Sequence, residues 1–179
     1  KREKKIMGVI LAAGNSTRMG KDNKLLKNID GAPLIRNIAL EITKSDLDSC
    51  SIVLGYQSDK VADVIKDLNI NLILNPLWKE GQASSLKAAL NSLTSSYTDV
   101  LIMLGDLPGI KSSHINRIIE EHLSSENRRS KITIPSFKGE KGNPVIWGRS
   151  FFHDLSNLEG DSGGRVLFSQ HPAAINLIE

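Results

Sequence analysis

The chain has 179 residues, of which 40% are apolar and 24% are charged, a composition typical of a folded globular protein rather than of a disordered segment. Its 23 Lys and Arg residues exceed its 20 Asp and Glu residues, but residues 6–179 balance, so the net charge of +3 comes from residues 1–5. We therefore predict a solvated basic tail over residues 1–5 and no nucleic-acid partner. The single cysteine, Cys50, excludes an internal disulfide and a cysteine-based zinc site. No apolar run approaches the ~20 residues of a membrane span, which predicts a cytoplasmic protein without a membrane partner.

The predicted elements alternate between strand and helix along the chain. Short runs of continuous apolar residues favour strands that are covered on both faces, and they occupy Ile6–Leu11, Ile52–Leu54, Leu72–Leu74, Val100–Leu104 and Ile132–Ile134. Apolar residues with helical spacing lie between these runs, over residues 34–42, 61–68, 83–93 and 115–123. This alternation predicts a three-layer α/β fold in which a doubly wound, mostly parallel, Rossmann-like sheet forms one domain over residues 1–179. After Ser136 the alternation ends, and frequent glycines predict loops and short elements attached to the sheet.

The loop after the first predicted strand has the composition of an anion-binding loop. Small residues over Gly14–Lys24 allow backbone N–H groups to approach an anion, and Arg18, Lys21 and Lys24 would neutralise it. The loop is not a Walker loop, because five residues separate its two glycines, and Ser16 stands where a dinucleotide fingerprint needs its second glycine. In sheets of this kind, ligands bind beyond the carboxyl ends of the strands, where this loop is placed.

Five segments carry a resemblance to a known family, in the same order along the chain. They are L-A-A-G-x-S-x-R-M-G-x-x-x-K-L-L at Leu11–Leu26, N-P-x-W-x-x-G-Q-A-S-S-L at Asn75–Leu86, L-G-D-x-P at Leu104–Pro108, G-N-P-V at Gly142–Val145 and G-D-x-G-G-R at Gly160–Arg165. The first segment resembles the signature loop of the nucleotidyltransferase superfamily. Together the five resemble the molybdenum cofactor cytidylyltransferases, which have a MobA-like NTP transferase domain of the nucleotide-diphospho-sugar transferase type.

This resemblance implies an enzyme that joins CTP to a molybdopterin-type acceptor, forms the cytosine dinucleotide cofactor and releases pyrophosphate, with Mg²⁺ as its cofactor. A molybdoenzyme is then a possible recipient of the product. The run Ala12-Ala13-Gly14 is the cytidine form of the signature, whereas guanosine users have Ala-Gly-Gly. Relatives commonly place proline before the signature lysine, where this chain has Asn23, so we expect a less rigid loop here.

The resemblance also implies roles for individual residues. Lys24 would reach the α-phosphate, Arg18 would hold the β- and γ-phosphates, and Asp106 would bind Mg²⁺ with Asp161 as the second carboxylate. The implied nucleotide-binding residues are Leu11, Ala12, Ala13, Gly14, Asn15, Ser16, Arg18, Lys24, Asn75, Gly81, Ser84 and Asp106. The implied acceptor-binding residues are Asn143, Pro144, Gly163, Gly164 and Arg165.

Structural roles compete with several of these assignments. Asp106 could cap a turn before Pro108, and Asp161 could be the N-cap of a helix beginning near Ser162. Arg165 could be a surface cation on that helix. Trp78 and Trp147 are expected to pack in the core rather than to stack on a ligand. With 4% aromatic residues, the sequence shows no alternation of basic and aromatic residues that would predict nucleic-acid binding.

Two other functions stay open at this point. One is transfer to another acceptor, either by a GTP:molybdopterin guanylyltransferase or by a nucleotidyltransferase that uses a sugar or alcohol phosphate. The other is a non-catalytic carrier or insertion chaperone for the pterin cofactor. A carrier would need no triphosphate cations or metal ligands, so the presence of Arg18, Lys24 and Asp106 favours the enzyme.

Overall fold

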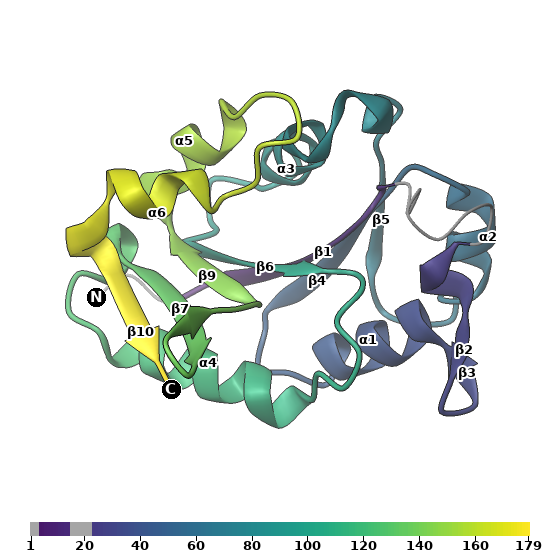
Figure 1. Ribbon diagram of the computed structural model, residues 1–179, viewed down its shortest axis with the longest axis horizontal. Helices are drawn as coiled ribbons and strands as arrows, with labels where there is room; N and C mark the ends of the chain where they lie inside the picture. The colour runs from purple at the N-terminus through teal and green to yellow at the C-terminus, as the bar shows by residue number, and fades with distance from the viewer. Residues whose placement is uncertain (1–3, 15–22) are drawn as a thin grey trace.

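The computed structural model describes residues 4–14 and 23–179. All five apolar runs form strands of one central sheet (Figure 1), namely β1 (Ile6–Ala12), β4 (Ser49–Leu54), β5 (Asn71–Leu74), β6 (Asp99–Leu104) and β7 (Ile132–Phe137). Strands β5, β4, β1 and β6 lie in that order and run parallel. The predicted α/β architecture with a mostly parallel sheet is therefore confirmed.

The chain after Ser136 contributes more to the sheet than the sequence predicted. β9 (Val145–Gly148) is fully buried and pairs antiparallel with both β6 and β7, and β10 (Ile175–Ile178) runs parallel to β7 at one edge. β8 (Glu140–Lys141) forms a hairpin with β7, and a separate small hairpin joins β2 (Asn28–Ile29) to β3 (Ala32–Pro33). β9 is one of the short elements expected in this part of the chain, but its place between β6 and β7 was not predicted, because a four-residue strand is too short to give a periodic signal.

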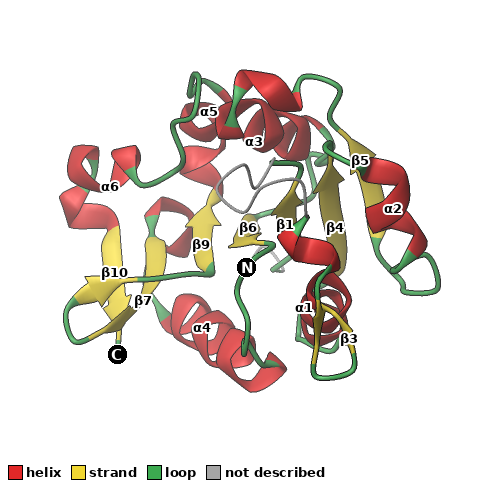
Figure 2. Ribbon diagram, turned by 45° about the vertical axis from the view of Figure 1, so that its right-hand side comes forward, coloured by secondary structure: helices red, strands yellow, loops and turns green. Residues whose placement is uncertain are grey.

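Helices cover both faces of the sheet (Figure 2). One face carries α1 (Leu34–Thr43), α2 (Ser58–Asp63) and α4 (Ser112–Ser124), and the other carries α3 (Gln82–Asn91), α5 (Phe152–Ser156) and α6 (Val166–Gln170). Single turns of 3₁₀ helix occupy Lys24–Leu26, Trp78–Glu80, Arg128–Ser130, Arg149–Phe151 and Pro172–Ala174. Among the described residues, no helix has the length and apolar character that a membrane crossing requires.

Two helices differ from the predicted ones. α2 ends at Asp63, and the rest of the apolar stripe lies in turns, although Ile65 is still buried in the core. α6 begins at Val166, so the helix expected near Ser162 is wrong. Gly163 and Gly164 lie between these positions, and glycine lowers helix stability by about 1 kcal/mol per residue.

The edge strand β5 is less covered than its apolar sequence predicted. Leu72 and Leu74 are 47% and 64% exposed, because β5 has a neighbouring strand on one side only.

Lys5 was predicted to lie in a solvated tail over residues 1–5, but it packs against the folded domain. Its backbone N–H donates to Thr98 Oγ1 at 3.0 Å, and its ammonium group lies 4.6 Å from the centre of the Tyr97 ring. Lys4 is exposed, and residues 1–3 lie outside the described residues.

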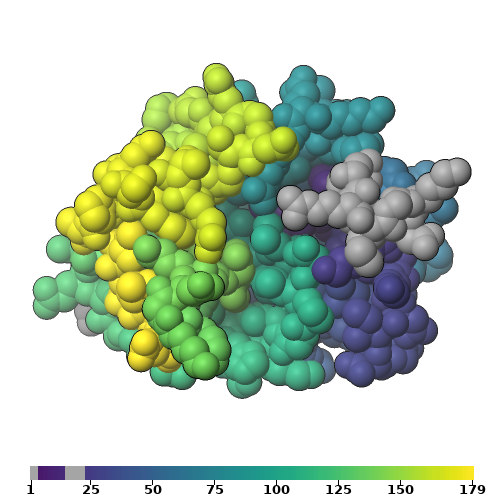
Figure 3. All heavy atoms as spheres, in the orientation of Figure 1, coloured from purple at the N-terminus to yellow at the C-terminus, as the bar shows by residue number. Residues whose placement is uncertain are grey.

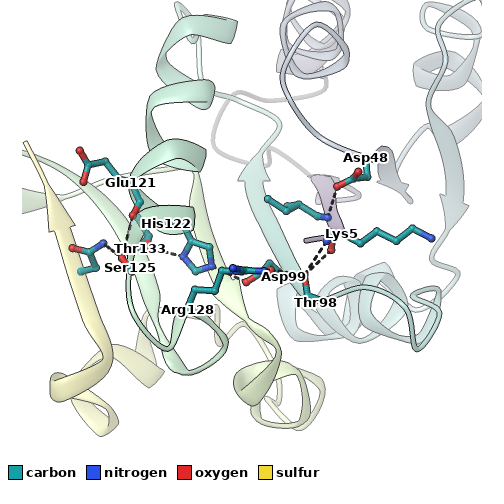
Figure 4. Close-up of polar contacts among 11 residues, drawn as sticks. Lys5, Asp48, Thr98, Asp99, Glu121, His122, Ser125, Arg128 and Thr133 are labelled. Atoms are coloured by element: carbon teal, nitrogen blue, oxygen red, sulfur yellow. Dashed lines mark hydrogen bonds and ion pairs between the residues drawn. The ribbon is translucent and has the colours of Figure 1, made fainter. Parts of the chain in front are cut away.

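A buried polar network joins α4 to the sheet (Figure 4). His122 Nε2 donates to Asp99 Oδ1 at 2.7 Å, and its Nδ1 lies 2.7 Å from Thr133 Oγ1. The hydroxyl of Thr98 donates to the other carboxyl oxygen of Asp99 at 2.6 Å. Asp99, His122 and Thr133 are completely buried, so each hydrogen bond replaces one that water supplies in the unfolded chain.

We expect His122→Ala to lower the free energy of unfolding by about 3 kcal/mol, because it leaves Asp99 Oδ1 and Thr133 Oγ1 buried without their partner. Chemical denaturation measures this loss. Arg117→Ala, an exposed change on the same helix, is the matched control and should leave the stability unchanged. Equal stability of the two variants would contradict a structural role for the network.

Burial also controls the chemistry of Cys50 on β4. Cys50 is 8% exposed, and burial raises the pKa of its thiol to about 11. Because the thiolate is the reactive form, we expect the native protein at pH 8 to react with a disulfide reagent about a hundredfold more slowly than an exposed cysteine. Absorbance of the released chromophore measures the rate. In guanidinium chloride the thiol should react at once, and fast labelling without denaturant would contradict the assignment.

Candidate active site

The candidate site lies at the carboxyl edge of the sheet, where the chain order reverses. From β1 the chain goes to β4 and β5 on one side and then returns to β6 on the other. Ala13 and Gly14 follow β1, and Gly105 and Asp106 follow β6, with Gly105 N–H donating to Leu11 O at 3.0 Å. Such a reversal opens a crevice between the two loops, which is where open α/β sheets bind their ligands.

The first cavity at this edge has a volume of about 640 Å³ and brings together opposite charges. Lys24 contributes a cation, and Asp106 and Asp161 contribute carboxylates from segments far apart in the sequence. The lining residues are Leu11, Ala12, Ala13, Gly14, Asn23, Lys24, Leu25, Trp78, Lys79, Gly81, Gln82, Ser85, Leu104, Gly105, Asp106 and Asp161. Three predicted nucleotide-binding residues, Asn15, Ser16 and Arg18, lie outside the described residues.

Asn23 fixes the turn that carries Lys24. Its side-chain oxygen accepts a hydrogen bond from Leu25 N–H at 3.0 Å and so caps the 3₁₀ turn Lys24–Leu26. The φ angle of Asn23 is −78°, within the range that a proline ring allows. The chain therefore keeps a proline-like backbone here and holds it with a side-chain cap, which offsets the rigidity expected to be lost.

Asn75 and Ser84 hold the loop behind the cavity and do not line it. The Asn75 amide donates to Ser84 Oγ at 2.9 Å and to Ser85 Oγ at 3.0 Å, and its oxygen accepts from Leu77 N–H at 3.0 Å. Ser84 Oγ in turn donates to Gly81 O at 2.7 Å. With Asn75 only 3% exposed, these hydrogen bonds use its polar atoms to shape the loop.

Gly81 brings this loop against the turn at Gly160 and Asp161. A Cβ atom at Gly81 would lie 2.3 Å from Gly160 O and 2.6 Å from Asp161 Oδ1, and its φ of +111° is one that other residues rarely adopt. Ala83 N–H donates to Gly160 O at 3.1 Å. In Figure 3 the teal segment that includes the Gly81 loop and the yellow-green segment around Gly160 meet at the top of the face shown. Asp161 is thus placed on the cavity wall, and the N-cap position of α6 is occupied by Arg165.

A second cavity of about 460 Å³ adjoins the first and has a different character. Of the predicted acceptor residues, Asn143, Gly163, Gly164 and Arg165 line it, whereas Pro144 is buried beside it and does not. The other lining residues are Leu11, Gln82, Leu86, Ile102, Leu104, Gly142, Val145, Trp147, Leu155 and Phe168.

The second cavity has an aromatic wall and one cationic side chain. Trp147 stacks on Phe168 with 5.6 Å between ring centres, and it is 2% exposed, so the expected packing role is compatible with its place in the wall. The guanidinium of Arg165 donates to Lys141 O, which holds it beside the hairpin that leads into β9. Trp78 lies in the wall of the first cavity, where it contacts Tyr56 at 5.5 Å between ring centres.

Sequence reasoning did not single out Gln82, Ser85 or Lys79, all three of which line the first cavity. Gln82 and Ser85 are three residues apart at the start of α3, so a helix beginning at Gln82 turns both toward the same side. The only available signal was their position inside the motif at Asn75–Leu86. The apolar residues of the second cavity gave none, because their pattern is the same as that of core residues.

The donor set of the first cavity fits a divalent cation that keeps part of its water shell. Asp106 and Asp161 both line the cavity, and both are exposed. Residues 4–14 and 23–179 contain no group of three or more potential metal-ligating side chains. Mg²⁺ is held in just this way in many phosphate sites, by one or two carboxylates together with phosphate oxygens and water.

We expect Gly81→Ala to lower the free energy of unfolding by about 2 to 3 kcal/mol, because it adds a steric clash to an unfavourable φ angle. Gly109→Ala is the matched control, since Gly109 has a φ of +83° but no atom within 4 Å of the added Cβ. The control should lose about 1 kcal/mol. Thermal and chemical denaturation measure both changes, and a larger loss in the control would contradict the proposed clash.

Comparisons with known proteins identify the family of the chain. The family model for the MobA-like NTP transferase domain matches residues 8–175. Nicotine blue oxidoreductase of Paenarthrobacter nicotinovorans is 25% identical over 182 residues, which cover 97% of this chain and 86% of that protein. The bifunctional protein GlmU of Staphylococcus saprophyticus is 29% identical over 160 residues, which cover 89% of this chain. The chain spans about a third of the length of the GlmU proteins that it matches.

A solved structure gives the same result for the fold. The crystal structure of Rv0371c from Mycobacterium tuberculosis H37Rv superposes with a TM-score of 0.81 at 25% identity, over 98% of this chain and 87% of that chain. A second structure of Rv0371c, a complex with manganese, has a TM-score of 0.80 at 24% identity and covers 98% and 88% of the two chains. The chain therefore belongs to the MobA-like NTP transferase family, and its domain is of the nucleotidyltransferase enzyme class.

Proposed function

We propose that this domain transfers the cytidylyl group of CTP to a molybdopterin-type cofactor, forming the cytosine dinucleotide cofactor and releasing pyrophosphate. The observation that carries the proposal is the pair of adjoining cavities at the carboxyl edge of the sheet. One holds charged groups suited to a triphosphate and a metal ion, and the other has mostly apolar and aromatic walls. A reaction between a nucleotide and a ring-containing acceptor needs both.

Support for CTP comes from the first cavity. Lys24 lies in its wall, and Asp106 and Asp161 add the carboxylates for Mg²⁺. Arg18 is assigned to the β- and γ-phosphates, and Asn15 and Ser16 to backbone contacts with the triphosphate. The small residues Ala12 and Ala13 line the cavity beside Gly14, in the order that resembles cytidine-using members of the family. The structural neighbour Rv0371c has been solved as a complex with manganese, which is consistent with the use of a divalent metal.

Support for a molybdopterin-type acceptor comes from the second cavity. A planar ring system with a terminal phosphate gains from apolar contact and from a cation, and here Trp147, Phe168 and Arg165 offer both. A sugar phosphate would instead need polar partners for its several hydroxyl groups, because buried hydroxyls without partners cost about 1 to 3 kcal/mol each. Among the described lining residues, Asn143, Gln82 and Arg165 are the polar side chains.

The chemistry of the step requires positioning and charge neutralisation rather than a covalent intermediate. An oxygen of the acceptor phosphate attacks the α-phosphorus of CTP, the bond between this phosphorus and the bridging oxygen to the β-phosphate breaks, and pyrophosphate leaves with the electron pair. The acceptor phosphate is already ionised at pH 7, so no side chain has to remove a proton. Lys24 stabilises the negative charge that builds up on the α-phosphate. Mg²⁺ held by Asp106 and Asp161 would supply further positive charge to the phosphate oxygens.

The direct test is pyrophosphate release with molybdopterin and each of the four ribonucleoside triphosphates, with the product identified by mass spectrometry. Of the four triphosphates, we expect only CTP to give pyrophosphate release in the presence of molybdopterin. The product should have the mass of the cytidylylated cofactor. Turnover with GTP, or with CTP and a sugar or alcohol phosphate, would contradict the proposed substrates. Binding of the cofactor without pyrophosphate release would indicate a carrier, and oxidation or reduction of a substrate without release would indicate an oxidoreductase.

Lys24→Ala tests the role of the signature cation. We expect it to lower kcat by about 10² to 10³, because it removes a positioned charge from the group that is transferred. Lys27→Ala is the matched control, since Lys27 is exposed, lies three residues away and does not line the cavity. Steady-state pyrophosphate release measures both variants, and an unchanged kcat for Lys24→Ala would disprove its role.

A further inference from the structure

Gln82 occupies a place in the fold that no other described polar side chain shares. Three residues line both cavities, and they are Leu11, Gln82 and Leu104. Two of them are leucines, so Gln82 supplies the one polar side chain common to the two walls. A group that passes from a ligand in one cavity to a ligand in the other has to cross this boundary.

The surroundings of Gln82 position its amide group and leave it available. A Cβ atom at Gly163 would lie 2.5 Å from Gln82 Oε1, so the glycine makes room for this side chain. Gln82 is the first residue of α3 and is partly buried, and within residues 4–14 and 23–179 its amide group has no hydrogen-bond partner. The loop contact at Gly81, one residue before it, fixes the backbone at this point.

We infer that Gln82 is a catalytic residue whose Nε2 donates a hydrogen bond to the α-phosphate as it is transferred between the cavities. This inference rests on the proposed function and adds a group that contacts the reacting phosphate. Gln82 neither gives nor takes a proton. The new bond joins the acceptor phosphate oxygen to the α-phosphorus, and the bond from the α-phosphorus to the departing pyrophosphate breaks. During this exchange the Gln82 amide donates to a non-bridging oxygen of the α-phosphate and stabilises its negative charge. The flanking Leu11 and Leu104 strengthen this hydrogen bond by keeping the local dielectric low.

The first test compares wild type with Gln82→Met, which keeps the length of the side chain and removes its amide. We expect kcat for pyrophosphate release from CTP and molybdopterin to fall about 10- to 100-fold, the value of a hydrogen bond to a charged group. The Kd for CTP and the Tm should stay at their wild-type values, since the contact forms at the reacting phosphate. Lys87→Met, an exposed change on the same helix, is the matched control with unchanged kcat.

The second test uses Gln82→Glu, which keeps the size of the side chain and replaces the N–H donor with a carboxylate that repels the phosphate. We expect a loss of kcat at least as large as that of Gln82→Met, with an unchanged Tm. Wild-type kcat in either variant would overturn the inference about Gln82. An absence of pyrophosphate release by the wild-type protein would instead overturn the proposed function, so the two failures are distinguishable.

Discussion

The close contact between the Gly81 loop and the turn at Gly160 is the constraint on which the site depends. Gly81 and Gly160 are 79 positions apart in the sequence, and the backbone at Gly81 can meet Gly160 O only because no side chain lies between them. The contact places Gln82 at the boundary of the two cavities and Asp161 on the wall of the first. A side chain at residue 81 would force the two loops apart and would move both groups together. The geometry of the site thus depends on the absence of a side chain at Gly81 as much as on the charged residues.

The two cavities divide the chemistry between the halves of the sheet. The turn at Lys24 and the loop after β6 supply charge on one side, together with Asp161 from the turn after Gly160, while β9, α6 and the adjacent loops supply apolar and aromatic surface on the other. This division follows from the topology, because the reversal of strand order at β1 and β6 opens a crevice and β9 fills the sheet beside it. Ligands of opposite character can therefore meet at one boundary.

The network of Asp99, His122 and Thr133 has a structural role and lies far from the candidate site. Asp99 begins β6, whereas the site lies beyond the end of that strand, so the buried polar contacts and the reactive edge occupy opposite ends of the same strand. The network joins α4 to β6 and β7 and adds hydrogen bonds to the apolar packing of the helix on the sheet. Changes to these residues should affect stability and leave the chemistry of the site intact.

The sequence by itself determined the alternation of strands and helices and the membership of the MobA-like NTP transferase family. Continuous apolar runs and helical spacing are local properties, and the five motifs are read residue by residue. Tertiary structure alone decided that Val145–Gly148 is a central strand and that Lys5 is held by a hydrogen bond to Thr98. It also decided that Leu72 and Leu74 are exposed and that Asn75 and Ser84 lie behind the cavity wall. It also decided that Gln82 faces both cavities. These outcomes depend on which segments far apart in the chain come into contact, and no local pattern encodes such pairings.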